Sequence, residues 1–407
     1  MVAVLGSACG GSPSSTAAFS PAPSSTQGLA HPPITGYIHT SGSSIYDSSD
    51  KKVRLIGIDT FSLSPGPATT ACHGHTWSAI PASEITTEAA DGFNEVRIAI
   101  TWENLEPTAP SGDVHHWDGA YLTAMTSAVR AYNQAGIAVI LDFHQVYWSP
   151  AFNATNSSIT SECQGSGMPM WAYPNASGGL SVKQAACDFY KDQPEPGVAQ
   201  KPVDGLIAAE TFLAGYFAPA NLASHGRVIG FDMLNEPPPV VGTTCAGQVG
   251  PDMLRIYGRI GRSILAVNSD AALIYEDYAF ESYTLSGFLL STALSLPNSI
   301  YSAHAYPATW NSRVPSNCPP GKAASGLPFY TAHVQRAASF NQPLWIGEFN
   351  AFATPSSCPD SNWQQDAKAE LDFSTAHDVS WSFWSFRDLS SHLAVLPLLQ
   401  AGGARAG

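Results

Sequence analysis

Short apolar runs alternate with longer segments of helical pattern from residue 53 to the end of the chain. The runs are rich in β-branched and aromatic residues, and most are continuously apolar, which is typical of strands buried on both faces of a sheet. This pattern predicts eight strands, at residues 53–59, 95–100, 137–143, 228–234, 272–276, 299–305, 343–349 and 380–386.

The segments between these runs predict helices, most clearly at residues 118–134, 204–223, 252–267 and 362–376. Asp118, Asp204 and Asp252 open three of them as predicted N-caps, because an aspartate can accept hydrogen bonds from backbone N–H groups at a helix start. The alternation indicates parallel strands joined by helical crossovers, and eight such strands predict a (β/α)8 TIM barrel. A doubly wound open sheet is the alternative, but the glycine-rich phosphate loop that normally follows its first strand is missing.

Two segments depart from the alternation. Residues 145–203 are the longest stretch between a strand and the next helix, and they are rich in Gly, Pro, Asn and aromatic residues. We predict that this insertion builds one wall of a cleft, because long loops on a rigid scaffold often carry function. After the last predicted strand, we expect a short, irregular closing helix at residues 392–399.

The chain has 407 residues and begins with a leader-like segment. Residues 1–9 resemble the end of an export signal, and residues 10–33 form a Ser/Pro-rich linker that cannot bury a core. Residues 34–407 are predicted to form the single barrel domain. We expect a secreted protein, or alternatively a bacterial lipoprotein anchored through Cys9, since small residues precede that cysteine.

Charge and composition exclude several classes of partner. Charged residues make up only 12% of the chain and the net charge is −14, which argues against binding to nucleic acid or to an anionic membrane surface. No apolar run approaches the roughly 18 residues of a spanning helix. A surface polar through hydroxyl and aromatic groups suits a neutral, hydroxyl-rich ligand such as a sugar. We expect a monomer.

Seven cysteines are present, and Cys9 lies in the leader, which leaves six in the domain. Six cysteines in a secreted domain suggest up to three disulfides, with 15 possible connectivities. Loop length favours Cys163–Cys187 and Cys318–Cys358. The chain has no C-x-x-C motif, and the histidine pairs His73/His75 and His115/His116 lack helical ligand spacing, so we expect no metal and no cofactor.

Polar residues gather at the ends of the predicted strands, where catalytic groups of a TIM barrel lie. Two of them, Glu236 and Glu348, end the fourth and seventh strands. Glycoside hydrolysis needs one acid to protonate the leaving oxygen and one carboxylate to attack, and retention of configuration needs the two about 5–5.5 Å apart. Asp142 and Glu276 also lie near strand ends and are the alternative carboxylates.

The remaining strand-end residues have roles on this interpretation. Arg97 would keep Glu348 ionised, and Tyr306 would donate to the same carboxylate. Asn235 would hold the sugar 2-hydroxyl. His144 and His304 would orient sugar hydroxyls or the acid. Trp384 would offer an apolar face to the sugar ring. Each also has a structural interpretation, as a core ion-pair partner, a core histidine or barrel packing.

The motifs resemble glycoside hydrolase family 5, a large family that includes many cellulases. They are LNEP at 234–237, IGEF at 346–349, HAY at 304–306, VRIAITW at 96–102 and WSFWSF at 381–386. The resemblance spans residues 50–390 and implies a (β/α)8 barrel with Glu236 as proton donor and Glu348 as nucleophile. It also matches the family's other active-site positions to Arg97, His144, Asn235, His304, Tyr306 and Trp384.

Further segments resemble the endoglycoceramidase-related branch of that family: residues 103–107, 115–122, 141–152 and 165–172. That branch usually has Asp where Val146 stands, and a C-terminal β-sandwich. We therefore predict a retaining endo-β-glycosidase that cleaves β-1,4-glucan by double displacement. The alternatives are a glycolipid hydrolase of the endoglycoceramidase type, a β-mannanase and, outside the enzymes, a catalytically dead carbohydrate-binding barrel.

Overall fold

The structure is a computed structural model, and it describes residues 31–64, 77–152, 165–238, 240, 243, 245, 247–277, 290–305, 323–350, 360–386, 397 and 399. The expected closing helix at 392–399 falls almost entirely outside these ranges. Within the described residues, no helix is long and apolar enough to cross a membrane.

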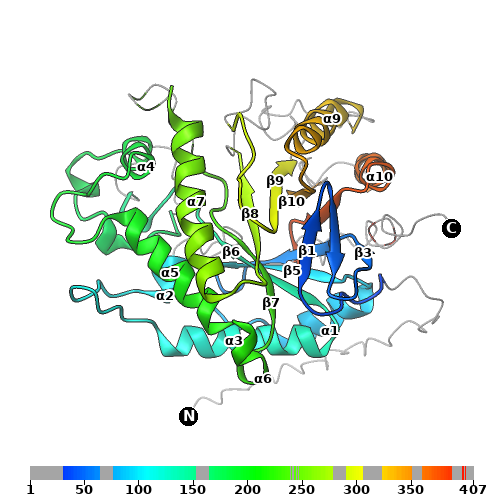
Figure 1. Ribbon diagram of the computed structural model, residues 1–407, viewed down its shortest axis with the longest axis horizontal. Helices are drawn as coiled ribbons and strands as arrows, with labels where there is room; N and C mark the ends of the chain where they lie inside the picture. The colour runs from blue at the N-terminus through cyan, green and yellow to red at the C-terminus, as the bar shows by residue number, and fades with distance from the viewer. Residues whose placement is uncertain are drawn as a thin grey trace, which may run out of the picture.

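Eight parallel strands form a closed barrel, which confirms the predicted TIM barrel (Figure 1). The last strand pairs with the first, so the ring has no edge. Every residue of these strands is buried, because the core fills the inside and helices cover the outside. In chain order the strands are β4 (Ile56–Thr60), β5 (Glu95–Ile100), β6 (Ala138–Phe143), β7 (Val228–Asp232), β8 (Ala272–Glu276), β9 (Ser299–Ala305), β10 (Leu344–Phe349) and β11 (Ser380–Phe383).

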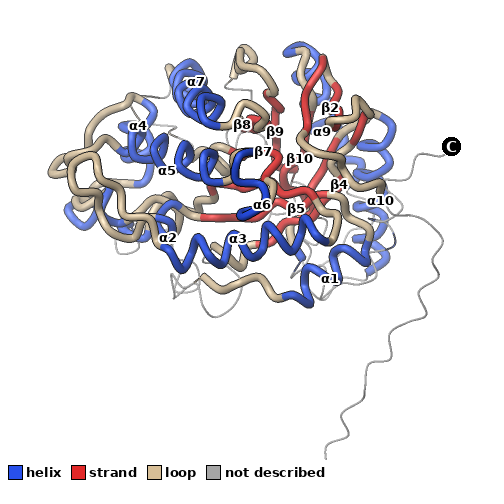
Figure 2. Tube along the Cα trace, turned by 60° about the horizontal axis from the view of Figure 1, so that its bottom comes forward, coloured by secondary structure: helices blue, strands red, loops and turns tan. Residues whose placement is uncertain are grey.

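Helices surround this ring (Figure 2). The longer ones are α1 (Ala82–Asp91), α3 (Gly119–Gln134), α4 (Val182–Tyr190), α5 (Pro202–Tyr216), α7 (Val249–Val267), α9 (Ala323–Phe340) and α10 (Asp360–Ala376). The shorter ones are α2 (Trp102–Leu105), α6 (Leu222–His225) and the 3₁₀ turns η1 (Pro150–Phe152), η2 (Met170–Ala172), η3 (Ala176–Gly178) and η4 (Pro219–Asn221).

One of the three predicted N-caps is confirmed. The Asp118 side chain accepts from the backbone N–H of Tyr121 at 2.7 Å. Asp204 and Asp252 instead lie in the first turns of α5 and α7. At α5 the start is set by Pro202, whose fixed φ and missing N–H suit the first helical position. An acidic residue within the first turn still favours the helix through its dipole.

A small antiparallel sheet, which we did not predict, precedes the barrel. It comprises β1 (Ile38–Ser41), β2 (Ser44–Asp47) and β3 (Lys52–Val53), so Val53 belongs to this sheet and not to the first barrel strand (dark blue in Figure 1). The apolar side chains of this sheet join side chains of the barrel strands in one buried cluster: Ile34, Ile38, Ile45, Val53, Leu55, Ala138, Ile140, Ile229, Ala272, Ile274, Ile300 and Trp345. The sheet therefore packs against the barrel core.

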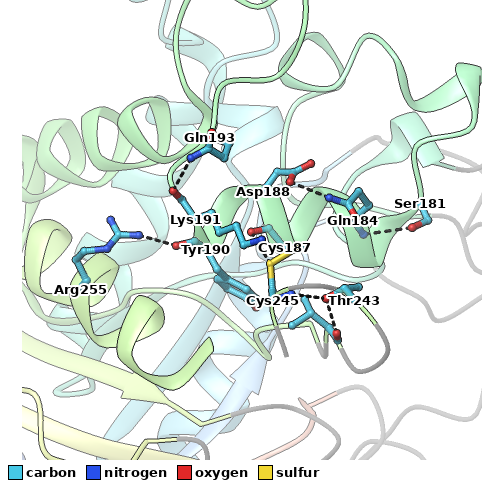
Figure 3. The surroundings of a disulfide bond; sticks show 11 residues. Ser181, Gln184, Cys187, Asp188, Tyr190, Lys191, Gln193, Thr243, Cys245 and Arg255 are labelled. Atoms are coloured by element: carbon cyan, nitrogen blue, oxygen red, sulfur yellow. Dashed lines mark hydrogen bonds between the residues drawn. A yellow bond between two sulfur atoms is a disulfide. The ribbon is translucent and has the colours of Figure 1, made fainter. Parts of the chain in front are cut away.

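A disulfide joins Cys187 on α4 to Cys245, in the segment before α7 (Figure 3). The predicted pairing of Cys163 with Cys187 is therefore wrong; Cys72, Cys163, Cys318 and Cys358 lie outside the described residues. The bonded pair has a Cα–Cα separation of 5.6 Å although 58 positions part them in the chain. Proximity in the fold decides the pairing, and loop length along the chain does not.

Removing this disulfide should destabilise the protein. The variant Cys187→Ser/Cys245→Ser is expected to lose about 3–4 kcal/mol of unfolding free energy, because the bond closes a long loop in the unfolded chain. Urea unfolding with and without reductant measures the effect. Reductant should weaken the wild type and leave the double variant unchanged; equal stability of the two proteins under oxidising conditions would contradict the prediction.

Candidate active site

Arg97 on β5 is the centre of a buried polar cluster inside the barrel, and its side chain is fully buried. Its Nη1 donates to Glu348 at 2.7 Å, and its Nη2 donates to Asn235 Oδ1 at 2.8 Å and to Asp232 at 2.9 Å. Three more carboxylates lie within 3.2–3.7 Å of the guanidinium: Asp59, Asp142 and Glu276. Burial alone would lower the pKa of Arg97, but the carboxylates, Asp142 and Asp232 foremost, raise it well above its ordinary value.

Burial opposes the ionisation of some carboxylates around Arg97. Burial raises the pKa of Asp59 and of Asp232 well above its ordinary value, and the attraction of Arg97 offsets only part of this effect. Deeper in the barrel, burial raises the pKa of Glu95 to about 8. Protonation therefore relieves part of the repulsion that so many acidic groups would create around one guanidinium.

Glu236 follows β7 with a φ of 41°, in the left-handed region that non-glycine residues seldom adopt. Two side chains hold this backbone. Its N–H donates to Glu276 Oε2 at 3.1 Å, and its carbonyl accepts from Gln145 Nε2 at 2.6 Å. The Glu236 side chain is 24% exposed, while that of Glu348 is 5% exposed. This conformation leaves the Glu236 carboxyl group the more accessible of the two.

Glu348 on β10 stands opposite Glu236, and one carboxylate oxygen of each lies within 4.8 Å of the other. One oxygen of Glu348 accepts from Arg97, and the second lies 3.5 Å from His304 Nδ1. Burial raises the pKa of Glu348, and the positive charges of His304 and Arg97 oppose the shift. The arrangement pairs a buried, cation-bound carboxylate with an accessible one.

His304 on β9 lies between the acidic groups. Its Nδ1 is 3.1 Å from Glu236 Oε1, and its Nε2 is 3.0 Å from Glu276 Oε1. Burial would lower its pKa, but Glu276 and Glu348 raise it well above the ordinary value. These acidic neighbours therefore favour the protonated imidazole.

His144 and Trp384 form a second, aromatic part of the site. His144 Nδ1 contacts Asp142 Oδ2 at 2.7 Å, which fixes the ring. That ring stacks on the Trp384 indole with centroids 5.2 Å apart, and Phe61 stacks on the same indole at 5.5 Å. Trp384 thus lies among aromatic side chains at the end of β11.

The structure brings together most of the residues predicted from strand ends. Arg97, Asn235, Glu236, His304 and Glu348 form one contact network, with His144 and Trp384 beside it; Tyr306 lies outside the described residues. Three residues of this network were not predicted as site residues: Asp59, Gln145 and Asp232. Asp59 and Asp232 lie at or near the ends of predicted strands, and Gln145 lies in the motif at residues 141–152, so each position could have indicated a role.

Among the residues that the structure describes, two triads have donor atoms close enough for a cation: Asp232–Glu276–His304 and Glu236–His304–Glu348, each with one atom per residue within 4.8 Å of the others. Both depend on His304. A histidine nitrogen that carries a proton has no lone pair for a metal. Since its acidic neighbours favour the protonated ring, these triads fit a proton-bearing site better than a metal centre.

Comparisons with known proteins bear on the family and the fold of this chain. The family model described as Cellulase (glycosyl hydrolase family 5) matches residues 46–390. Among solved structures, an endogalactoceramidase is similar at 22% identity, with a TM-score of 0.67 over 88% of this chain and 78% of that one. Endo-glycoceramidase II from Rhodococcus sp., in its ganglioside GM3 complex, has 19% identity and a TM-score of 0.63, covering 85% and 76%.

A hyperthermostable endocellulase is also similar, at 18% identity and a TM-score of 0.53, covering 86% of this chain and 90% of that one. At these identities the structural likeness shows a shared fold. The family match establishes more than a shared fold, because it extends over most of the chain. It includes the LNEP and IGEF motifs, which contain Glu236 and Glu348. The chain therefore belongs to glycosyl hydrolase family 5, and the protein is a glycoside hydrolase.

Proposed function

We propose that the protein is a retaining endo-β-glycosidase that works by double displacement, with Glu348 as nucleophile and Glu236 as acid/base. The observation that carries this proposal is the approach of the two carboxylate groups, whose nearest oxygens lie within 4.8 Å. This close approach suits the roughly 5–5.5 Å between the carboxyl groups of a retaining enzyme better than the roughly 6.5–9.5 Å of an inverting one, which must admit a water between them.

The two half-reactions follow from the contacts. Glu348 attacks the anomeric carbon and forms an ester, while Glu236 gives its proton to the departing glycosidic oxygen. The ionised Glu236 then takes a proton from water, whose oxygen attacks the anomeric carbon and releases Glu348. Asn235 Oδ1 accepts from Arg97 at 2.8 Å, and its Nδ2 donates to the carbonyl of Gln145 at 3.2 Å, so this side chain is held in place; we assign it the contact with the sugar 2-hydroxyl.

Two substrate classes are supported by different observations. The family model is named for cellulases, which supports β-1,4-glucan. The endoglycoceramidase structures and the local motifs support a glycolipid, and the Rhodococcus enzyme is recorded with ganglioside GM3 and with a cellobiose-like imidazole. We propose that the cleaved bond is a β-glucosidic one and that a glycolipid is the first substrate to test. β-Mannan has no comparable support.

The insertion after β6 offers one detail relevant to the choice. Its large aromatic side chains Trp148, Phe152, Tyr173 and Phe189 are buried. Met170 is 59% exposed, and Val114 on a neighbouring loop is 61% exposed. The residues next to them, Trp171 and His115, both bind Glu106. Glu106 thus links the loop of Val114 to the 3₁₀ turn that contains Met170, and we propose these two exposed apolar side chains as a contact for an aglycone with a lipid tail.

The deciding experiment incubates the purified full chain with ganglioside GM3 and, in parallel, with soluble β-1,4-glucan. Release of an intact oligosaccharide from the ganglioside alone supports the glycolipid. Oligosaccharides from the glucan alone would replace it with an endoglucanase. Proton NMR of the first product gives the anomeric configuration, and an inverted product would refute the double displacement.

The rate should depend on pH in a bell shape. Burial raises the pKa of Glu348 above its ordinary 4.5, and the nucleophile must be ionised. As the pH falls through this raised pKa, Glu348 gains a proton and kcat/KM falls, so the acid limb should lie above pH 4.5. The alkaline limb should flatten with an aryl glycoside, whose leaving group needs no proton from Glu236. An acid limb below pH 4.5 would contradict the assignment.

We also propose that the protein is exported, on the basis of its leader-like segment. The Cys187–Cys245 disulfide supports this proposal, because such bonds persist mainly in oxidising compartments. Anchoring through a lipid on Cys9 is the more specific form of the proposal. Metabolic labelling with a fatty acid, compared between wild type and Cys9→Ser, tests it.

A further inference from the structure

We propose that Glu276 is a positioning residue that maintains His304 as a fixed cation shared by the two catalytic glutamates. One imidazolium then balances negative charge in both half-reactions. This inference rests on the proposed double displacement and adds to it a residue that contacts neither the anomeric carbon nor the leaving oxygen.

Glu276 ends β8 and is 2% exposed. Its two oxygens have different partners. Oε1 lies 3.0 Å from His304 Nε2, and Oε2 accepts from the backbone N–H of Glu236 at 3.1 Å. The same carboxylate thus holds the imidazole on one side and the left-handed backbone of the acid/base on the other. Shifting it would move both groups together.

The other imidazole nitrogen faces the reaction. His304 Nδ1 is 3.1 Å from Glu236 Oε1 and 3.5 Å from Glu348 Oε2. Before reaction the negative charge is on Glu348; in the glycosyl-enzyme Glu348 is an ester and the charge is on Glu236. The negative charge therefore moves from Glu348 to Glu236, and the N–H group at His304 Nδ1 lies near an oxygen of each. The imidazole can balance the charge in both half-reactions without rotating.

In the described part of the chain, the titratable groups whose charges act on His304 are Asp59 (β4), Asp232 (β7) with Glu236 just after it, Glu276 (β8) and Glu348 (β10). Arg97 (β5) contacts the last two of these carboxylates. Burial favours neutral forms of Asp59 and Asp232, while Glu236 and Glu348 change charge during turnover. Glu276 is the remaining carboxylate, and its attraction is the largest of the influences that raise the pKa of His304.

Gly347 completes the arrangement on β10. A Cβ atom at this position would lie 3.1 Å from His304 Nε2 and 2.9 Å from Ser302 Oγ. A glycine therefore leaves the imidazole room to approach Glu276. The contact between His304 and Glu276 depends on both the carboxylate and this vacant space.

The direct test measures the protonation of His304 by NMR of ¹⁵N-histidine-labelled full-length protein, with His304→Gln to assign the signal. In the wild type, the ring should stay an imidazolium through neutral pH. In Glu276→Gln, its titration midpoint should fall by at least about one pH unit, because the main attracting charge is gone. Glu88→Gln, which removes a buried carboxylate on α1, is the control and should leave the midpoint unchanged. An unchanged midpoint in Glu276→Gln would overturn the proposal.

The kinetic test uses an aryl glycoside with a good leaving group, so that breakdown of the glycosyl-enzyme limits the rate. Glu276→Gln should lower kcat about tenfold, a part of the roughly 10²–10⁴-fold that acid–base catalysis supplies. Glu276→Asp keeps the charge and should fall between wild type and Glu276→Gln; a loss as large as that of Glu276→Gln would count against the charge. The NMR result does not depend on turnover, so it stands apart from a failure of the proposed function.

Discussion

Hydrolysis should fall by at least about 10⁴-fold when Glu348 is replaced by alanine, because the covalent step loses its proposed nucleophile and Glu236 is needed as the acid/base. Glu348 accepts a hydrogen bond from Arg97 at 2.7 Å, and one of its carboxylate oxygens lies within 4.8 Å of an oxygen of Glu236. Michaelis–Menten kinetics on an aryl β-glucoside measure the loss. Asp372→Ala, at a surface ion pair on α10, is the matched control and should keep full activity.

Azide should separate the roles of the two glutamates. In Glu348→Ala, azide can occupy the vacated position and attack the anomeric carbon, which gives an α-glycosyl azide. In Glu236→Ala, azide replaces the water of the second half-reaction, which gives a β-glycosyl azide after two inversions. The same azide anomer from both variants would contradict the assignment, and a fully active Glu348→Ala would refute the nucleophile.

Replacing Arg97 with methionine should be the most destabilising single change in the barrel. The guanidinium is fully buried among the carboxylates described above, and its loss leaves buried charge without a partner. Such losses typically cost about 3–5 kcal/mol. Urea unfolding at pH 7 measures the effect, with the exposed Arg130→Met as control.

The loss of unfolding free energy in Arg97→Met should be larger at high pH than at low pH. Without Arg97, the folded-state pKa values of Asp59 and Asp232 rise further above those of the unfolded chain. A carboxyl group with a raised folded-state pKa destabilises the fold at high pH, and the penalty shrinks as the pH falls and the folded state binds a proton. Arg97→Met should therefore lose more stability at pH 8 than at pH 5. A loss independent of pH would show that packing, and not charge, dominates.

The barrel could be predicted because each of its strands is buried on both faces and therefore reads as a continuous apolar run. The small sheet β1–β3 has no such signal. Residues such as His39 and Lys52 alternate with buried ones, and the run at residues 53–59 crosses the boundary between two sheets. The disulfide partner of Cys187 depends on how α4 packs near the segment before α7, which no local pattern records.

The two glutamates proposed as the catalytic pair could be predicted to lie together with their main partners, because parallel strands end on one face of a barrel. The carboxylates around Arg97 were harder to recognise. Asp59 ends one apolar run and Asp232 lies inside another, and a single acidic residue in a strand does not by itself indicate a functional role. Only the register of β4, β5 and β7 shows that their side chains converge on the guanidinium.

Closure of the ring through β11 has a consequence for synthesis on the ribosome. β11 pairs with β10 on one side and with β4 on the other, and it is the last barrel strand to be made. Until residues 380–383 leave the exit tunnel, β4 and β10 are open strand edges that can pair with other chains. The nascent chain therefore carries an open sheet until β11 is made, and chaperone binding is most valuable between the synthesis of β10 and that of β11.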